Sequence, residues 1–192
     1  MISRRNSALA LASIAAAATI FVAPVHAQNA PRVKLATSLG DIVVELNPAK
    51  APKTVENFLK YVADKHYDGT IFHRVIDGFM IQGGGMTANL QEKATRAPIP
   101  LEANNGLKNV RYSIAMARRP DPNSATAQFF INVKDNTMLD APKPDGHGYA
   151  VFGQVIAGQE VVDKIRQVPT GRQGMYSDVP LRTVTIIAAT QL

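Results

Sequence analysis

The chain has 192 residues, a formal net charge of +6 and no cysteine. The absence of cysteine excludes disulfides, thiolate chemistry and cysteine-based zinc sites. The positive charges are scattered along the sequence, without a basic stripe interleaved with aromatic residues, so nucleic acid is not expected as a partner.

Residues 1–27 have the three parts of a secretory signal peptide. Two arginines near the start are followed by an uncharged, alanine-rich run at 8–23 and by small side chains at Val25 and Ala27. The apolar run is shorter than the roughly 20 residues that a membrane-spanning helix needs. We therefore expect cleavage after Ala27, which leaves a single mature domain at 28–192 without stable membrane insertion.

Two strands and a helix are predicted at the start of the mature domain. The strands, at 33–37 and 40–46, flank a turn, and the second has the apolar alternation of a half-buried strand. Pro52 suits a first helical turn, and apolar residues then repeat at helical spacing. This helix is predicted to end near His66.

Short apolar runs dominate the rest of the chain and are predicted to form strands. They lie at 70–75, 79–82, 113–117, 129–133, 150–155 and 182–188. A second helix is predicted from Gln159 to Arg166, where apolar residues share one face. Eight short strands and two helices predict a mainly β fold, a closed eight-stranded antiparallel barrel with two covering α-helices.

The sequence lacks the patterns of common catalytic and metal sites. No serine lies in a nucleophile-elbow motif. Three histidines of the mature domain, His66, His73 and His147, do not have metal-ligand spacing. Gly83–Gly85 is not followed by the residues of a phosphate loop and is interpreted as tight backbone after a strand. We therefore expect neither a metal nor a cofactor.

Two segments combine a few polar side chains with aromatic residues. Phe72–Gly85 holds one arginine, Arg74, and one glutamine, Gln82, whereas Asn123–Asn132 mixes amides with phenylalanines. These segments resemble the two signature stretches of the cyclophilin family. The resemblance covers residues 32–190, because further matching motifs follow in the family's order and spacing.

The resemblance implies a peptidyl-prolyl cis-trans isomerase and is to the periplasmic cyclophilins of Gram-negative bacteria in particular. It implies proline-containing peptides and unfolded exported proteins as partners, the periplasm as location, and a monomer. An alternative is a proline-peptide-binding chaperone module with incidental turnover. The presence of Arg74 favours the isomerase, since a binding module could lose this residue and still hold peptide.

The resemblance also assigns roles to individual residues. The catalytic residues it implies are Arg74, as a donor to the nitrogen of the rotating amide, and Gln82, which steadies Arg74 and bonds substrate backbone. The substrate-binding residues it implies are Phe79, Met80, Phe130 and Leu139 in a proline slot, Gln128 at the substrate backbone, Ala117 and Arg118 along the peptide edge, and Met138 and Tyr149 at the rim.

Three positions depart from the family's common pattern. Met138 stands where many eukaryotic members have tryptophan, which argues against tight cyclosporin binding, and Tyr149 replaces a common pocket histidine. The segment Arg118–Asp121 differs from the usual small-residue loop and is one residue longer. Because it brings two positive charges, on Arg118 and Arg119, we hypothesise a preference for peptides with acidic residues.

Overall fold

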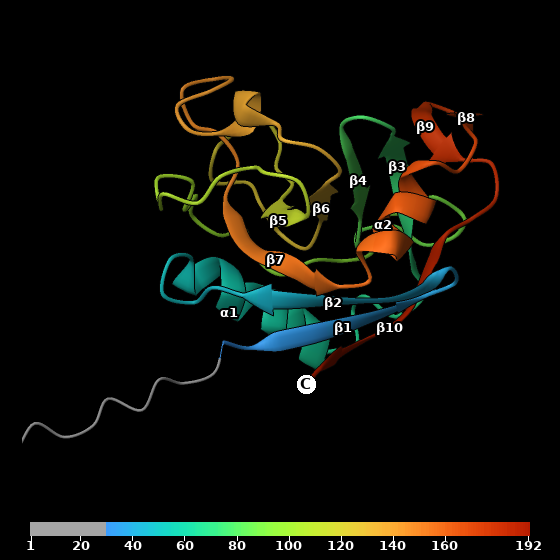
Figure 1. Ribbon diagram of the computed structural model, residues 1–192, viewed down its shortest axis with the longest axis horizontal. Coiled ribbons are helices and arrows are strands. Elements are labelled where there is room, and N and C mark those ends of the chain that lie inside the picture. The colour runs from blue at the N-terminus through green and yellow to red at the C-terminus, as the bar shows by residue number, and fades with distance from the viewer. Residues whose placement is uncertain (1–29) are drawn as a thin grey trace, which may run out of the picture.

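The computed structural model describes residues 30–192, so the predicted signal peptide lies outside the described residues. Eight antiparallel strands of the described part close into a barrel in the order β1-β10-β3-β4-β6-β5-β7-β2 (Figure 1). These strands are β1 (Arg32–Thr37), β2 (Gly40–Leu46), β3 (Thr70–Ile76), β4 (Met80–Gly83), β5 (Ser113–Met116), β6 (Phe129–Asn132), β7 (Val151–Ala157) and β10 (Thr185–Gln191). The predicted closed eight-stranded barrel is confirmed.

The alternation read from the sequence explains how the first hairpin enters the barrel wall. In β2, Ile42, Val44 and Leu46 are buried, while the residues between them are partly exposed. The bounds predicted for this strand agree with the structure. Burial of one face in this way fixes the strand's register, because a slip by one residue would turn the apolar set toward water.

Two α-helices bury one face each, as predicted. They are α1 (Pro52–Ala63) and α2 (Gln159–Arg166), and a single 3-10 turn, η1 (Thr137–Leu139), lies between β6 and β7. In α1, the ring of Phe58 lies 5.2 Å from that of Phe152 and 5.7 Å from that of Phe129, measured between centroids. These contacts tie α1 to the aromatic centre of the barrel core.

The first helix ends three residues before the predicted position, at Ala63 rather than His66. Lys65 adopts a left-handed conformation with φ 55°, and the N–H of His66 donates to the carbonyl of Tyr61 at 3.0 Å. This hydrogen bond and the left-handed residue form a common helix stop. Glycine usually occupies the left-handed position, so a lysine there gives no stop signal in the sequence.

A small hairpin that the sequence did not predict lies outside the barrel. It consists of β8 (Thr170–Gln173) and β9 (Tyr176–Pro180), and β9 packs beside β3 (Figure 1). The last barrel strand correspondingly begins at Thr185 and not at Arg182. Because β8 is exposed or half-exposed and polar, it lacks the apolar alternation that marks a strand.

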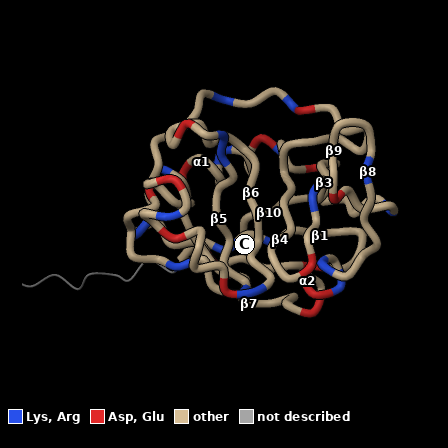
Figure 2. The backbone as a smooth tube through the Cα atoms, turned by 90° about the horizontal axis from the view of Figure 1, so that it is seen from above, with Lys and Arg blue, Asp and Glu red and all other residues tan. Residues whose placement is uncertain are grey.

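Charged residues of both signs are interspersed over the molecule (Figure 2). Many of them form exposed pairs, such as Arg32 with Glu45 at 2.8 Å and Lys60 with Glu56 at 2.6 Å. None of the helices between residues 30 and 192 is both long and apolar enough to cross a membrane.

Candidate functional site

A cavity of about 780 Å³ gathers most of the residues that the resemblance assigned to substrate. The predicted residues that line it are Arg74, Phe79, Met80, Gln82, Ala117, Arg118, Gln128, Phe130, Leu139 and Tyr149. Met138 is not among the lining residues and is 47% exposed. Met138 therefore lies outside the cavity in this structure, whereas its neighbour Leu139 lies in the wall.

The apolar part of the cavity is a small cluster separate from the barrel core. Met80, Phe130 and Leu139 are buried in this cluster, and Phe79 and Tyr149 pack against it. Met80 and Phe130 come from neighbouring strands, β4 and β6, so the sheet fixes their positions. We call this cluster the proline slot, defined by Phe79, Met80, Phe130 and Leu139.

Arg74 lies on β3, where its side chain is exposed while His73 and Val75 are buried. The pairing of β3 with β4 shifts register between Phe72 and Arg74, which marks a β-bulge. Within residues 30–192, Arg74 makes neither an ion pair nor a side-chain hydrogen bond at the distances that define them. Its guanidinium donors are thus available to a ligand.

Gln82 lies directly opposite Arg74 across the β3–β4 pair. Its Nε2 donates to Oε1 of Gln128 at 2.9 Å, so the side chain is held by another glutamine and not by the arginine. A Cβ at Gly85 would collide with Gln128, which shows why glycine is needed beside this pair. The structure therefore joins two predicted polar residues, but in a different pairing from the one predicted.

His73 is buried directly beside Arg74 in the chain and lines the same cavity. Burial lowers the pKa of His73 from its ordinary value of 6.5 to about 4. The ring is therefore neutral at pH 7, and Arg74 supplies the positive charge of β3 at this site. No group of histidine and carboxylate side chains within the described residues has the arrangement of a metal site.

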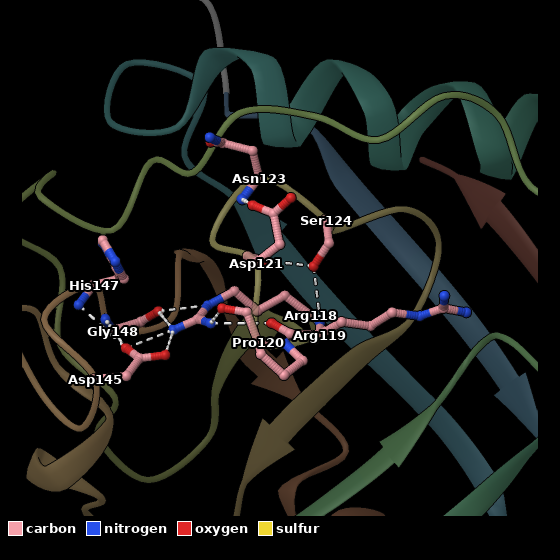
Figure 3. Close-up of polar contacts among 9 residues, drawn as sticks. All are labelled: Arg118, Arg119, Pro120, Asp121, Asn123, Ser124, Asp145, His147 and Gly148. Carbon is pink, nitrogen blue, oxygen red and sulfur yellow. Dashed lines mark hydrogen bonds and ion pairs between the residues drawn. The ribbon is translucent and has the colours of Figure 1, made fainter.

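The two arginines of the 118–121 segment both have carboxylate partners, of which Figure 3 shows that of Arg118. Nη2 of Arg118 lies 2.6 Å from Asp145, and Nη2 of Arg119 lies 3.8 Å from Glu92. The hypothesised preference for acidic peptides rests on these two positive charges. Both have carboxylate partners in the structure, which weakens that hypothesis.

The cavity also extends over residues for which the sequence gave no functional signal. They come from the long connection between β4 and β5 and from the β8–β9 hairpin, and include Met86, Lys93, Thr95, Met175 and Tyr176. Neither segment carries a motif or a regular apolar pattern. Their place at the cavity depends on tertiary packing alone.

The family model and the similar proteins point to one and the same family. The family model described as cyclophilin type peptidyl-prolyl cis-trans isomerase/CLD matches residues 32–191. The peptidyl-prolyl cis-trans isomerase cyp18 of Streptomyces antibioticus is 62% identical over 159 residues, which cover 82% of this chain and 96% of that protein. Peptidyl-prolyl cis-trans isomerase B of Escherichia coli K12 is 55% identical, over 80% of this chain and 95% of that protein.

Solved structures show the same relationship. A Cryptosporidium parvum cyclophilin type peptidyl-prolyl cis-trans isomerase, crystallised in the presence of the dipeptide Ala-Pro, matches with a TM-score of 0.68 and 29% sequence identity. The match covers 82% of this chain and 96% of that structure.

Proposed function

The chain belongs to the cyclophilin-type peptidyl-prolyl cis-trans isomerase family, and we propose that Arg74 is the group with which it accelerates rotation of X–Pro bonds. The observation that carries this proposal is the state of Arg74. Its guanidinium has no ion-pair partner among residues 30–192 and lines the same cavity as the proline slot. A free cationic donor that lines the same cavity as an apolar slot suits an X–Pro peptide, because this substrate has an apolar ring next to an amide bond.

The chemistry needs no proton transfer and no covalent step. Amide resonance maintains a rotation barrier of about 18–20 kcal/mol, and the lone pair of the nitrogen becomes localised when the amide twists. A donor aimed at that lone pair stabilises the twisted state more than either planar state, which is the condition for catalysis. An acceleration of about 10⁵-fold corresponds to roughly 7 kcal/mol of such stabilisation.

The remaining lining residues have matching tasks in this proposal. The proline slot holds the pyrrolidine ring, so that the carbonyl side of the bond turns while the ring stays in place. The joined amides of Gln82 and Gln128 offer donors and acceptors to the peptide backbone. Ala117 directly follows β5 and lines the cavity. The peptide would lie along this edge like an added strand.

The alternative function is a proline-peptide-binding chaperone in which turnover is incidental. The same slot would serve that function, but an unpaired arginine adjacent to it would have no task. A protease-coupled X–Pro isomerisation assay on the wild type, Arg74→Ala and Arg74→Lys separates the two. We expect Arg74→Ala to lose roughly 10²-fold or more in kcat/KM, as other enzymes do when a preorganised donor is removed.

Arg74→Lys is the matched control because it retains the positive charge but loses the planar set of donors. We expect it to recover only a small part of the activity. An Arg74→Ala protein as active as the wild type, or a wild type without activity above the uncatalysed rate, would favour the binding module.

The location and the cellular partners are also part of the proposal. We place the protein in the periplasm as a monomer that acts on unfolded exported proteins. The signal-peptide pattern at 1–27 supports export, and the resemblance to periplasmic cyclophilins supports the periplasm and the monomer. Expression of the full chain in a Gram-negative host, followed by fractionation and N-terminal sequencing, tests this. The expected result is a periplasmic protein that begins at Gln28, and a cytoplasmic protein that retains Met1 would contradict it.

A further inference from the structure

Arg118 follows β5 in a surface loop, yet its side chain is only 2% exposed. Nη2 of its guanidinium donates to both carboxylate oxygens of Asp145, at 2.6 and 2.8 Å (Figure 3). Nε and Nη2 donate to the carbonyl of Gly148 at 3.0 and 2.9 Å, and Nη1 donates to the carbonyl of Arg119 at 3.1 Å. All three nitrogen atoms are engaged, so the planar group has a single well-defined orientation.

These contacts hold the irregular segment 140–149, which connects η1 to β7. Within it, Asp145 also accepts from two backbone N–H groups, at 3.2 and 3.4 Å. At its end, the N–H of Tyr149 donates to the carbonyl of Leu139 at 3.0 Å. The segment thus returns to the residue that lines the proline slot, and Arg118 connects it to the end of β5.

A stack of side chains leads from Arg118 into the proline slot. The guanidinium carbon lies 4.6 Å from the ring centroid of Tyr149, within the range of cation–π attraction. The Tyr149 ring in turn meets the ring of Phe130 edge-on, with centroids 5.7 Å apart and an angle of 80°. Phe130 is 4% exposed and forms part of the slot wall. The position of the guanidinium is therefore coupled by direct contacts to that of the wall.

We propose that Arg118 is a positioning residue that sets the shape of the proline slot through Tyr149 and Phe130, and that Asp145 holds Arg118 in place. This inference rests on the proposed use of the slot for substrate prolines. Because the side chain of Arg118 is buried and its donors are engaged, it has no free donor for the rotating amide. We expect it to affect peptide affinity, through the shape of the slot. Rotation of the bound amide depends on Arg74 instead.

The charge state of the pair is suited to a permanent structural link. The hydrogen bond from Arg118 holds the pKa of Asp145 below its ordinary value of 3.8. Asp145 is therefore ionised throughout the neutral range. Lysine could not replace this arginine, since a single ammonium group cannot both bond two acceptors in a plane and lie flat against a ring.

Arg111 provides a control within the same chain, although its side chain is 45% exposed where that of Arg118 is 2% exposed. It pairs with Asp163 at 2.9 Å and lies 4.7 Å from the ring centroid of Tyr112. These are the same kinds of contact that Arg118 makes, but Arg111 is not among the residues that line the cavity. Arg111→Ala therefore removes an ion pair and a cation–π contact without disturbing the slot.

The test compares Arg118→Ala, Arg118→Lys and Asp145→Asn with Arg111→Ala. Three quantities are measured: KM and kcat for an X–Pro peptide, Kd for a peptide containing Ala-Pro, and the NMR resonance of the Met80 methyl group in the slot. For the Arg118 and Asp145 variants we expect KM and Kd to rise about five- to tenfold, the size of effect that one lost cation–π contact produces. We expect kcat to change less than about threefold and the Met80 resonance to shift. Arg111→Ala should leave all these quantities unchanged.

An Arg118→Ala protein that is folded and has unchanged Kd and Met80 resonance would overturn the proposal, as would equal changes in Arg111→Ala. If Arg118→Ala does not fold, Asp145→Asn decides by the same criteria. Peptide affinity and the Met80 resonance are read without turnover. If the wild type binds peptide but does not isomerise it, the proposed function is wrong. The role of Arg118 is then still decided by Kd.

Discussion

Two regions that line the same cavity contain arginines in opposite states. On β3, Arg74 is exposed and lacks an ion-pair partner within the described part of the chain. After β5, Arg118 is buried, and Asp145 and Gly148 engage its guanidinium. Free donors can respond to charge that develops during a reaction, whereas fully engaged donors can only hold geometry. The roles proposed for the two arginines thus rest on their partners.

The energetic consequences of the pairings also differ. The exposed pair of Arg119 with Glu92, at 3.8 Å, is worth at most about 1 kcal/mol because water screens it. Removing one partner of a fully buried pair costs about 3–5 kcal/mol. The pair of Arg118 with Asp145 belongs to neither class, since the arginine side chain is 2% exposed and the aspartate side chain 38%.

The contrast between the two arginines would be lost if Arg74 had a carboxylate partner, as Arg118 has. Gln82→Glu does this, because residue 82 lies opposite Arg74 across the strand pair. We expect kcat/KM to fall about 100-fold, since an engaged guanidinium is no longer free for the amide nitrogen. The measurement is the X–Pro isomerisation rate across a range of pH.

Gln82→Met controls for loss of the amide that bonds Gln128. The glutamate variant should approach the activity of this control as the pH falls below about 4, where the new carboxyl group becomes protonated. Equal activity of Gln82→Glu and Gln82→Met at pH 7 would show that Arg74 does not need to be unpaired.

The neutral state of His73 bears on the contrast between the two arginines, because Arg74 is then the positively charged group that β3 places at the cavity. The pKa of His73 is about 4 in the folded protein, against 6.5 as its ordinary value. Between these values the unfolded state binds more protons, so stability is present above pH 6.5 and is lost as the pH falls toward 4. We expect the free energy of unfolding, measured with urea, to drop by about 2 kcal/mol from pH 7 to pH 5 because of this group.

His73→Gln identifies the contribution of this histidine, because glutamine does not titrate. The variant should lose about 2 kcal/mol less than the wild type over the same pH interval. Parallel pH profiles of the two proteins would mean that His73 titrates normally in the folded state.

Two neighbouring residues allow a finer test of where the slot ends. Leu139 is 8% exposed and lines the cavity, whereas Met138 is 47% exposed and does not. We expect Leu139→Ala to raise KM about tenfold, in line with the loss of a buried leucine contact. Met138→Ala should change KM less than about twofold. Equal effects of the two changes on KM would place Met138 in the site after all.

Two elements with a regular buried apolar face could be predicted from the sequence to the residue. β2 and α2 have the predicted bounds because their apolar residues follow the period of a strand or a helix. The end of α1 could not be predicted, since a lysine occupies the left-handed position where glycine would be the usual signal. The β8–β9 hairpin is polar and largely exposed, so it too leaves no pattern.

Most of the residues that the resemblance assigned to the site do line the cavity, but the resemblance did not indicate how they are connected. Gln82 bonds Gln128, which is 46 residues away, and Arg118 pairs with Asp145, which is 27 residues away. Both pairings depend on how loops and strands meet in the folded barrel. For that reason neither the bond between Gln82 and Gln128 nor the carboxylate partner of Arg118 could be predicted from the sequence.

The central claim is that Arg74 acts on the bound amide while it rotates. The most direct measurement is the cis-trans exchange rate of an X–Pro peptide at saturating enzyme, obtained by NMR exchange spectroscopy for the wild type and Arg74→Ala. We predict that the exchange rate on the enzyme falls at least about 100-fold in Arg74→Ala, while Kd for the peptide changes less than about threefold. An exchange rate within twofold of the wild type would contradict the account.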